Sequence, residues 1–516
     1  MNLARSIATV GVFTMLSRIL GFVRDILIAA ILGAGLAADA FFVAFKFPNL
    51  FRRLFAEGAF NLAFVPLYAG LLEEEGREAA KEFADQALAV LLWALLVFVV
   101  VLEIAMPWAM MAFAPGFLAN PHKFQLAVEL ARITFPYLLF ISLVSLMAGV
   151  LNSLGRFAAA AATPILLNVC LIGFVLGLSP ITETPGHALA WGVFTAGIVQ
   201  FIWLYAHCGR YGVWLRLPRP RLTQNVRLLI KRALPVAVGA GIYQINLLID
   251  TIIASLLPDG SISYLFFADR VNQLPLGVVG VAVGTALLPL MSRQIRAGDE
   301  GAALHSQNRA LEFSFLLTLP AAAALVVIAG PVISALFERG AFGAAETAAT
   351  AAALGVYATG LPAYVLVKTL APGYFARGDT ATPVKIAVAA MVVNLVLNLV
   401  LMGPFQHVGI AMATSVSAWI NAGLLALVLR RRGQLEPDRR LRRRLPRAVL
   451  AAAGMATLLA AAQGGLEGAL AGGLASRVAT LAGLVAGGLA VFAVLAVLLG
   501  GARVEDLKVL SRKDAA

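Results

Sequence analysis

Charged residues cluster in an N-terminal stretch that otherwise has the composition of two membrane helices. From Ser17 to Arg53, two apolar segments are joined by a short Gly/Ala turn at residues 33–38. The charged residues within this stretch are Arg18, Arg24, Asp25, Asp39, Lys46, Arg52 and Arg53. A charge at the centre of a lipid-facing helix costs at least ~2.5–3.5 kcal/mol. We therefore expect several of these side chains to line a water-filled chamber with a positive bias, or to pair inside a helix bundle.

The composition of the whole chain is that of a polytopic helical membrane protein. Of its 516 residues, 61% are hydrophobic and only 13% are charged, whereas soluble domains carry about 25% charged residues. The two cysteines, Cys170 and Cys208, lie in or beside apolar runs and offer neither a disulfide framework nor the spacing of metal ligands. The N-terminus lacks a small-residue cleavage site after a short apolar core, so we expect no removable signal peptide.

Apolar runs long enough to cross a ~30 Å hydrocarbon core recur along the chain. They predict fourteen spans, at residues 8–32, 37–69, 84–106, 125–151, 158–180, 187–208, 224–256, 264–292, 311–331, 347–373, 383–402, 408–430, 446–462 and 479–501. The loops on the side of the two termini hold most of the Lys and Arg residues, whereas the opposite loops hold only Lys123, Arg339 and Arg477. The positive-inside rule therefore places both termini in the cytoplasm. This topology also explains the net charge of +13 without nucleic-acid binding.

An internal repeat divides the predicted spans into two lobes. The stretch from Leu154 to Asn168 resembles that from Ala376 to Asn394, and each contains a Thr-Pro pair. Asn49 and Asn272 each precede a proline by seventeen residues. We therefore predict two pseudo-symmetric six-helix lobes around a central cationic cavity, as in transporters built from parallel repeats. The predicted lobes are residues 1–222 and 223–432, and an accessory helix pair with a cytoplasmic tail occupies 433–516.

The depth of the charges in the predicted spans favours an anionic ligand. At ~1.5 Å per residue, Arg24 and Arg270 lie roughly 10–12 Å below the outer helix ends, and Arg18 and Arg52 about 21–24 Å below them. Arginine captures phosphate groups bidentately and stays charged. Two tiers of arginine around one axis therefore predict a phosphorylated substrate. In the alternative interpretation, the Arg24–Asp25–Asp39 and Asp269–Arg270 groups are internal salt bridges that lock a closed state.

A second set of polar residues offers hard oxygen ligands at similar predicted depth. The set consists of Asp250, Asn394, Asn398 and Thr414. Such ligands could bind a monovalent cation that drives transport, although Asn and Thr also commonly form hydrogen bonds between membrane helices. The sequence contains no ATPase motif. We therefore expect no cofactor, and a driving force from Na⁺, H⁺, the membrane potential or the gradient of the substrate itself.

Three longer stretches resemble one family of transporters. They are the N-terminal run from Ala8 to Ala69, the run from Tyr264 to Arg293, and LFERGAF from Leu336 to Phe342. Together they are similar to the MurJ (MviN) lipid II flippases of the multidrug/oligosaccharidyl-lipid/polysaccharide exporter (MOP) superfamily, over essentially the whole chain. The resemblance implies a monomer of the bacterial inner membrane that flips undecaprenyl-diphosphate-linked lipid II for peptidoglycan synthesis and cell shape. Membrane lipids and cell-wall synthesis proteins are its expected partners.

The resemblance also implies roles for individual residues. Arg18, Arg24, Arg52 and Arg270 match the cavity arginines proposed to hold the diphosphate. Asp39, Asn49, Ser263 and Asp269 match other cavity and gating positions, and Asp25 lies beside them. The cation set falls where some members place a sodium site, but Asn398 stands where an aspartate is expected, which leaves one charge fewer. Gln273 stands where some members carry Glu.

Other functions agree less well with the sequence. A flippase for another polyprenyl-diphosphate-linked glycan has the same charge requirement, so only the N-terminal match opposes it. A cationic-drug exporter would favour acidic and aromatic walls. An enzyme acting on polyprenyl phosphates would need a catalytic motif in a sizeable loop, and none is present. A scaffold protein has no use for expensive intramembrane arginines.

Overall fold

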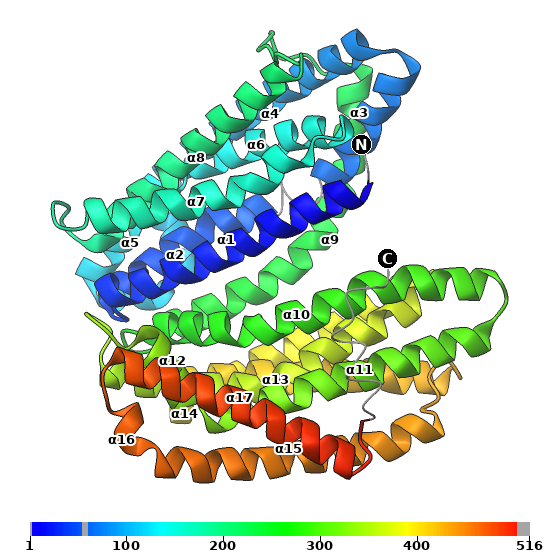
Figure 1. Cartoon of the computed structure of the whole chain (residues 1–516). Coiled ribbons are helices and arrows are strands. Elements are labelled where there is room, and N and C mark those ends of the chain that lie inside the picture. The colour runs from blue at the N-terminus through cyan, green and yellow to red at the C-terminus, as the bar shows by residue number, and fades with distance from the viewer. Residues whose placement is uncertain (1–2, 54–59, 503–516) are drawn as a thin grey trace. The chain divides into compact units, whose positions relative to one another are not determined.

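The computed structural model describes residues 3–53 and 60–502, and helices form almost all of this part of the chain. Its backbone contacts define two compact units (Figure 1). The first unit comprises Met1–Ser263 together with the short segment Arg339–Phe342, and the second comprises Tyr264–Glu338 and Gly343–Ala516. These boundaries differ from those of the lobes inferred from the repeat, at residues 222 and 432. The lobe assignment rests on the repeat alone and stays a prediction.

The first unit is a bundle in which aromatic side chains join neighbouring helices. Its elements are α1 (Leu3–Leu32), α2 (Leu36–Phe51), α3 (Asn61–Glu74), α4 (Arg77–Phe113), the 3₁₀ helix η2 (Pro115–Ala119), α5 (Pro121–Thr134), α6 (Tyr137–Ser153), α7 (Phe157–Gly177), α8 (Pro185–Arg210) and α9 (Gln224–Ser255). The Phe47 ring of α2 lies 4.3 Å from Phe113 and 5.0 Å from Phe135, between centroids. Aromatic pairs of this kind add about 0.5–1.5 kcal/mol beyond the area that they bury. They fix α2, which carries Asp39, against α4 and α5.

In the second unit, α13 packs against α14 and α11, and the C-terminal helices α15 and α17 pack against α11 and α12. Its elements are α10 (Ser261–Arg296, of which the first three residues belong to the first unit), α11 (Glu300–Val327), α12 (Ala329–Phe337), α13 (Ala344–Phe375), α14 (Ala381–Arg431), α15 (Arg439–Gly465), α16 (Glu467–Leu470) and α17 (Leu474–Leu498). Leu366 and Leu370 of α13 pack with Leu425 of α14 and Leu311 of α11 in one buried cluster. The α15–α17 pair contacts α11 and α12.

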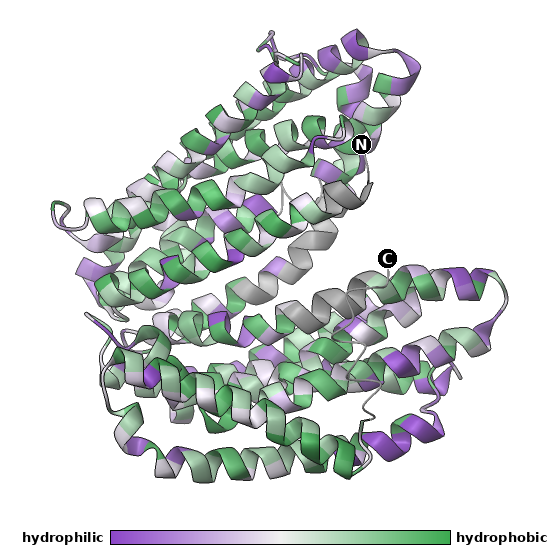
Figure 2. Ribbon diagram, in the orientation of Figure 1, coloured by the Kyte–Doolittle hydropathy of each residue, from purple (hydrophilic) through white to green (hydrophobic). Residues whose placement is uncertain are grey.

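Nine helices in the described part of the chain are long and apolar enough to cross a membrane. They are Arg77–Phe113, Pro121–Ser153, Phe157–Gly177, Pro185–Arg210, Glu300–Val327, Ala344–Phe375, Ala381–Arg431, Arg439–Gly465 and Leu474–Leu498. Hydrophobic residues dominate most of these helices in Figure 2. On α4, for example, Val97, Val101 and Ile104 are exposed, as expected of a lipid-facing surface. The chain is therefore an all-helical integral membrane protein.

The helices follow the predicted spans with two informative differences. The predicted span 125–151 is divided into α5 and α6 at Pro136, which lacks the N–H that would continue the helix. The predicted spans 383–402 and 408–430 are joined in α14, with a kink at Gln406 (φ 50°, ψ −130°). The predicted span 8–32 falls on α1, and the span 37–69 falls on α2 and α3, with residues 54–59 outside the described part of the chain. The spans 224–256 and 264–292 fall on α9 and α10. The total of fourteen spans stays a prediction.

Two glycines allow the segment 339–342 to pack against the end of α1. The Ala341 N–H donates to the carbonyl oxygen of Ala30 at 2.8 Å. Gly340 has φ +59°, and a Cβ at this position would lie 2.2 Å from the Ala30 oxygen. Gly33 has φ +70°, and its Cβ would lie 2.7 Å from the Ala341 oxygen. Both positions therefore require glycine, for conformation and for space.

The substitution Gly340→Ala is expected to lower the thermal stability of the purified protein markedly. A left-handed conformation costs about 1–2 kcal/mol for a residue with a Cβ, and the clash with the Ala30 carbonyl adds to this cost. Gly298→Ala is the matched control, because Gly298 also has a positive φ (+76°) but faces open space. Melting in detergent should rank wild type above Gly298→Ala and Gly298→Ala above Gly340→Ala. Equal losses in the two variants would contradict close packing at Gly340.

Candidate functional site

Arg24 on α1 lies buried between a carboxylate and an amide. Its Nε and Nη2 donate to Asp25 Oδ1 at 3.0 and 2.7 Å, and its Nη1 donates to Asn168 Oδ1 on α7 at 2.9 Å. Asn168 Nδ2 in turn donates to the Ser17 carbonyl at 3.0 Å. The Arg24 and Asp25 side chains are only 8% and 4% exposed. A charge-assisted fork of this kind holds the guanidinium in one orientation.

Gly21 of α1 lies beside the point where α1 and α7 approach each other around Arg24. A Cβ added to Gly21 would lie 3.5 Å from Asn168 Nδ2, in van der Waals contact with the amide. Gly21 is one turn before Arg24 on α1, so the two residues face the same neighbour. The sequence therefore brings the Asn168 amide within reach of both the Arg24 side chain and the backbone of α1.

Asp39 near the start of α2 is the acceptor of a second buried polar cluster. Its Oδ1 accepts from the Ser263 N–H at 2.9 Å and from the Ser263 hydroxyl at 2.7 Å. Its Oδ2 accepts from the Gly260 N–H at 2.8 Å and from Lys123 Nζ at 2.9 Å. The Asp39 side chain is only 1% exposed. A buried carboxylate is stable when donors and an opposite charge surround it in this way.

Lys123 joins this cluster to a second, more exposed carboxylate. Its Nζ lies 2.7 Å from Asp259 Oδ1, and the Asp259 side chain is 51% exposed. The ammonium also lies 4.3 Å from the centroid of the Phe117 ring, a favourable cation–π distance. Asn120 caps α5 by accepting from the Lys123 N–H, and Pro121 occupies the first turn. The cap thus places Lys123 in the first turn of α5, where it links α2 with the loop before α10.

The other predicted residues of the first unit lie apart from these two clusters. The Arg18 side chain is exposed and that of Arg52 is half-buried. Asn49 Nδ2 donates to the Phe45 carbonyl of its own helix at 2.8 Å. Lys46 Nζ lies 3.2 Å from Thr251 Oγ1 on α9.

In the second unit, the predicted residues Asp269 and Arg270 of α10 are half-buried, and Gln273 is exposed. The Arg270 guanidinium lies over the Phe266 ring, 4.9 Å from its centroid. Asp269 accepts a hydrogen bond from Gln273 Nε2, one turn further along the helix. At this position the neutral amide of Gln273 acts as a donor to a carboxylate, a role that a glutamate could fill only when protonated.

The predicted cation set belongs to both units. Asp250 lies in the first unit, and Asn394, Asn398 and Thr414 lie in the second. Asn398 Nδ2 donates to Asn394 Oδ1 at 3.0 Å, and Asn394 Nδ2 donates to Ser417 Oγ at 3.4 Å. Thr414 Oγ1 donates to the Ile410 carbonyl of its own helix at 2.8 Å. The Asn394–Ser417 hydrogen bond thus joins the two halves of the kinked helix α14, whereas Asn398 bonds within the first half.

Another group of metal-ligand types lies together among the described residues. Glu129, Glu183 and His187 each place one ligand atom within 4.8 Å of the others. Thr184 Oγ1 lies 3.0 Å from His187 Nδ1, and Gln125 donates to Glu129 at 2.9 Å. The spacing of these residues in the sequence did not indicate their proximity, because they come from α5, α8 and the loop before α8.

Three partners of the predicted residues were missed by sequence reasoning. Lys123 was assigned to an outer loop, although the signals for an earlier helix start, Asn120 and Pro121, are present in the sequence. Asn168 was noted only as part of the repeat. The loop position of Asp259 gave no indication that its carboxylate and that of Asp39 contact the same ammonium. In each case the partner is separated in sequence by more than eighty residues, so no local pattern links the two.

A family model decides what kind of membrane protein carries these clusters. The model described as lipid II flippase MurJ matches residues 28–496. The chain belongs to the MurJ family. The probable lipid II flippase MurJ of Rhizobium meliloti (strain 1021) is 46% identical over 460 residues, which cover 88% of this chain and 86% of that protein. The probable lipid II flippase MurJ of Vibrio cholerae serotype O1 is 37% identical over 516 residues and covers 98% of both chains.

Solved structures agree with membership of the MurJ family. A lipid II flippase MurJ in an inward closed conformation has a TM-score of 0.77 at 25% identity and covers 95% of this chain and 98% of its own. An inward-facing multidrug resistance MATE family transporter of the MOP superfamily has a TM-score of 0.68 at 14% identity, covering 82% and 97%. The second likeness concerns the fold alone. The fold of the chain is therefore of the MurJ type within the MOP superfamily.

Proposed function

We propose that this MurJ-family chain flips undecaprenyl-diphosphate-linked lipid II from the cytoplasmic to the periplasmic leaflet of the inner membrane. The observation that carries the proposal is the family match over residues 28–496. Relatives that align with the chain over most of their length are also named lipid II flippases. The physical requirement agrees with it. A diphosphate cannot cross hydrocarbon uncompensated, because burying an isolated charge is prohibitively expensive.

We propose that the diphosphate is held by the arginines Arg18, Arg24, Arg52 and Arg270. The chemistry of Arg24 supports this role, because its guanidinium already holds two anionic or carbonyl-type oxygens, Asp25 Oδ1 and Asn168 Oδ1. Phosphate oxygens are acceptors of the same geometry. Substrate binding would then exchange the Asp25 carboxylate for a phosphate group.

The proposed movement is alternating access of two six-helix lobes around a central cationic cavity, within fourteen spans and with both termini in the cytoplasm. The excess of Lys and Arg on the side of the termini supports this orientation. On the outer side, we assign the Asp39–Lys123–Ser263 cluster to closing the periplasmic entrance. Asp25, Asn49 and Asp269 are assigned to the cavity wall beside the arginines.

An ion gradient or the membrane potential is the proposed energy source. Asp250, Asn394, Asn398 and Thr414 are the candidate ligands for Na⁺, while the hydrogen bond of Asn394 with Ser417 supports the competing role in joining the halves of α14. Transport assays in vesicles with imposed Na⁺, H⁺ and potential gradients separate these sources.

Rescue of a bacterial strain depleted of its own lipid II flippase tests the proposed function. Wild-type protein is expected to restore growth and normal cell shape when it reaches the membrane at a level matched to the host flippase. Failure to rescue at matched expression would contradict lipid II flipping. Rescue instead of a strain that lacks a flippase for another polyprenyl-diphosphate-linked glycan would identify that glycan as the substrate, because arginines recognise the diphosphate and not the sugar.

A further inference from the structure

The junction between α14 and α15 carries the densest positive charge of the chain. Nine arginines lie within eighteen residues, namely Arg430, Arg431, Arg432, Arg439, Arg440, Arg442, Arg443, Arg444 and Arg447. Only Glu436 and Asp438 oppose them in this stretch. A topology signal requires positive charge on this side of the membrane, but it does not require any particular arrangement of the side chains. The structure separates the nine arginines into an inner set of four with protein contacts, Arg432, Arg440, Arg444 and Arg447, and an outer set of five.

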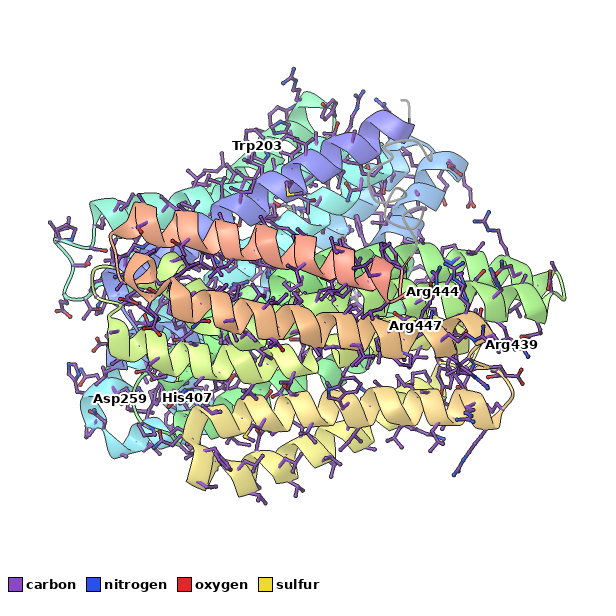
Figure 3. The ribbon with its side chains drawn as sticks, turned by 60° about the horizontal axis from the view of Figure 1, so that its bottom comes forward. Trp203, Asp259, His407, Arg439, Arg444 and Arg447 are labelled. Atoms are coloured by element: carbon purple, nitrogen blue, oxygen red, sulfur yellow. The ribbon has the colours of Figure 1, made fainter. Side chains whose placement is uncertain are left out.

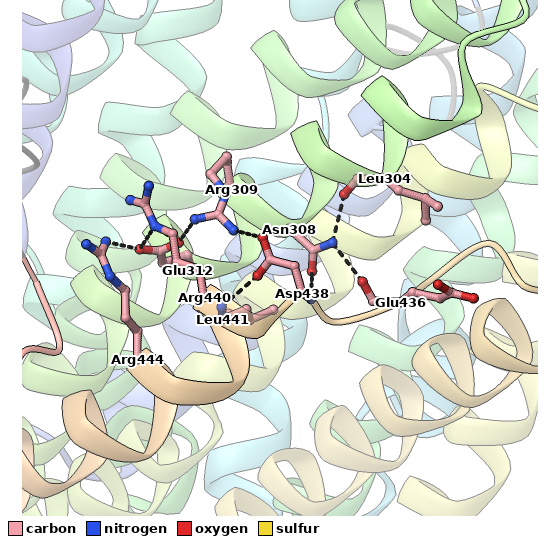
Figure 4. Close-up of polar contacts among 9 residues, drawn as sticks. All are labelled: Leu304, Asn308, Arg309, Glu312, Glu436, Asp438, Arg440, Leu441 and Arg444. Atoms are coloured by element: carbon pink, nitrogen blue, oxygen red, sulfur yellow. Dashed lines mark hydrogen bonds and ion pairs between the residues drawn. The ribbon is translucent and has the colours of Figure 1, made fainter.

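Two arginines of the inner set, Arg440 and Arg444, connect α15 to α11 through one glutamate. Glu312 of α11 accepts from Arg440 Nε at 3.1 Å and pairs with Arg444 (Figure 4). It also pairs with Arg309 of its own helix, which reaches across to Asp438. The side chains of Glu312 and Arg444 are only 12% and 9% exposed. Arg440 and Arg444 are four residues apart and therefore lie on the same face of α15.

Asp438 and Asn308 complete the attachment of the first turn of α15. Asp438 caps α15 by accepting from the Leu441 N–H at 2.7 Å. Asn308 Nδ2 donates to the Glu436 carbonyl at 2.8 Å (Figure 4). Because these bonds hold both the backbone and the side chains, the first turn of α15 has a fixed orientation about its own axis.

The other two arginines of the inner set, Arg432 and Arg447, also contact residues of the second unit. Arg432 pairs with Asp379 at 2.7 Å, and this guanidinium, with the Thr382 groups, holds the pKa of the Asp379 carboxyl well below its usual range. Arg447 Nη1 donates to the Gly500 carbonyl at 3.3 Å. In Figure 3, Arg439 lies at the start of α15, and Arg444 and Arg447 follow it along the helix. Arg432 thus connects the end of α14 to the loop before it, and Arg447 connects α15 to the end of α17.

The outer set is the remainder: Arg430, Arg431, Arg439, Arg442 and Arg443, all exposed. None of the five has a hydrogen bond or ion pair from its side chain to the residues that the structure describes. Arg439 and Arg443 are four residues apart, on the face of α15 opposite the buried Leu441. The inner contacts therefore turn three arginines of α15 outward.

The outer set lies where an apolar helix surface gives way to water. On α14, exposed Trp419 and Leu427 precede Arg430. On α15, exposed Val449 and Leu450 follow Arg443 by about two turns. In Figure 2 the first turns of α15 are strongly hydrophilic and the rest of the helix is largely hydrophobic. A change of this kind marks the boundary between hydrocarbon and headgroups.

We propose that the outer arginine set is a docking surface for the headgroups of anionic phospholipids, which anchor the α15–α17 pair in its leaflet. The charge of the surface is complementary to a phosphodiester, and the guanidinium binds such groups bidentately. Basic residues beside a membrane helix attract anionic lipid, each with an effect of about fivefold on affinity. The inner set cannot contribute equally, because its guanidinium groups already pair with Glu312 or Asp379 or donate to the Gly500 carbonyl.

The test uses the full-length protein in mild detergent with palmitoyl-oleoyl phosphatidylglycerol added to mixed micelles, and phosphatidylcholine of the same chains for comparison. Bound lipid is counted by native mass spectrometry, and the melting temperature is followed in parallel. We expect wild type to retain phosphatidylglycerol in preference to phosphatidylcholine. The triple variant Arg439→Gln/Arg442→Gln/Arg443→Gln should lose affinity for phosphatidylglycerol by roughly a hundredfold, at about fivefold per arginine. Its melting temperature in phosphatidylcholine should be that of wild type, because the three side chains have no partner to lose among the residues that the structure describes.

The matched control removes the same charge elsewhere. Arg216, Arg219 and Arg221 are exposed in the non-helical connection between α8 and α9, on the same predicted side of the membrane. Their triple Gln variant should retain most of the affinity, since no folded helix presents them together. Equal losses in the two triple variants would overturn the proposal in favour of net charge alone. If the α15 triple variant does not fold, Arg439→Gln and Arg443→Gln are tested singly, each with an expected loss of about fivefold.

Two other outcomes also overturn the proposal. Inorganic phosphate that displaces phosphatidylglycerol at equal phosphate concentration would indicate a site for the free anion and not for a lipid surface. Preference for an acidic peptide over phosphatidylglycerol would indicate a protein partner. The assay contains no lipid II, so its result does not depend on the proposed flipping activity.

Discussion

Replacing Arg24 by alanine is expected to abolish rescue of a flippase-depleted strain while the protein remains in the membrane. The Arg24 guanidinium donates three hydrogen bonds to Asp25 and Asn168 inside the first unit. If it takes the diphosphate in their place, no neighbouring side chain can supply the same planar fork. Arg24→Lys keeps the charge but not the fork, so partial rescue at most is expected. Growth and membrane level are measured together for each variant.

A purely structural role for Arg24 makes a different prediction. Removing one partner of a buried ion pair costs about 3–5 kcal/mol, because the remaining charge stays buried without compensation. The double variant Arg24→Ala/Asp25→Asn removes that charge and should recover much of the stability. A structural role predicts that rescue returns with stability, whereas substrate binding predicts a stable protein that still fails to rescue.

Arg270→Ala is expected to behave like Arg24→Ala, with the Phe266 ring left without its cation. Arg132→Ala is the control, since Arg132 is an exposed arginine within a predicted span whose Nε donates to the Glu103 backbone carbonyl. Arg132→Ala should rescue nearly as well as wild type. Near-wild-type rescue by both Arg24→Ala and Arg270→Ala would refute the role of the arginines in holding the diphosphate.

The sequence was sufficient to predict most helices because each helix depends on local information. Apolar runs of roughly 20 residues identify spans without knowledge of their neighbours. The two differences in helix boundaries also have local causes, at Pro136 and at Gln406. The charges of Arg24 and Asp25 within an apolar run likewise predicted that they line a polar chamber or pair inside a bundle, and in the structure these two residues form a buried ion pair.

The partners of the predicted residues could not be obtained from the sequence. Asp39 was grouped with Arg24 by depth, but its cation is Lys123, 84 residues further along the chain. Depth along a helix gives one coordinate, whereas pairing also depends on rotation of each helix about its axis. That rotation is set by packing, for example of Phe47 against Phe113 and Phe135. A similar limit applies to the arginines of α15, whose division into inner and outer sets follows from the position of Glu312 on another helix.

A large loss of stability is expected for Asp39→Ala. This substitution leaves four donors without their acceptor, namely Lys123 Nζ, the Gly260 N–H, and the N–H and hydroxyl of Ser263. Removing one partner of a buried ion pair costs about 3–5 kcal/mol. The Lys123 ammonium keeps Asp259 as a partner, which places the expected cost toward the lower end of that range. The melting temperature in detergent and the yield of folded protein measure the effect.

Asp259→Asn is the matched control, because Asp259 and Asp39 contact the same ammonium at similar distances but differ in burial. The Asp259 side chain is 51% exposed and that of Asp39 only 1%, and an exposed pair contributes about 0–1 kcal/mol. Asp259→Asn should therefore melt close to wild type, while Asp39→Asn melts clearly lower. Adding Lys123→Met to Asp39→Asn removes the buried charge that has lost its partner and should recover part of the loss. Equal costs for the two aspartates would mean that the ion pairing with Lys123 that they share, and not the burial of Asp39, sets the loss. No recovery in the double variant would mean that the backbone and Ser263 hydrogen bonds, and not the ion pair with Lys123, hold α2 in place.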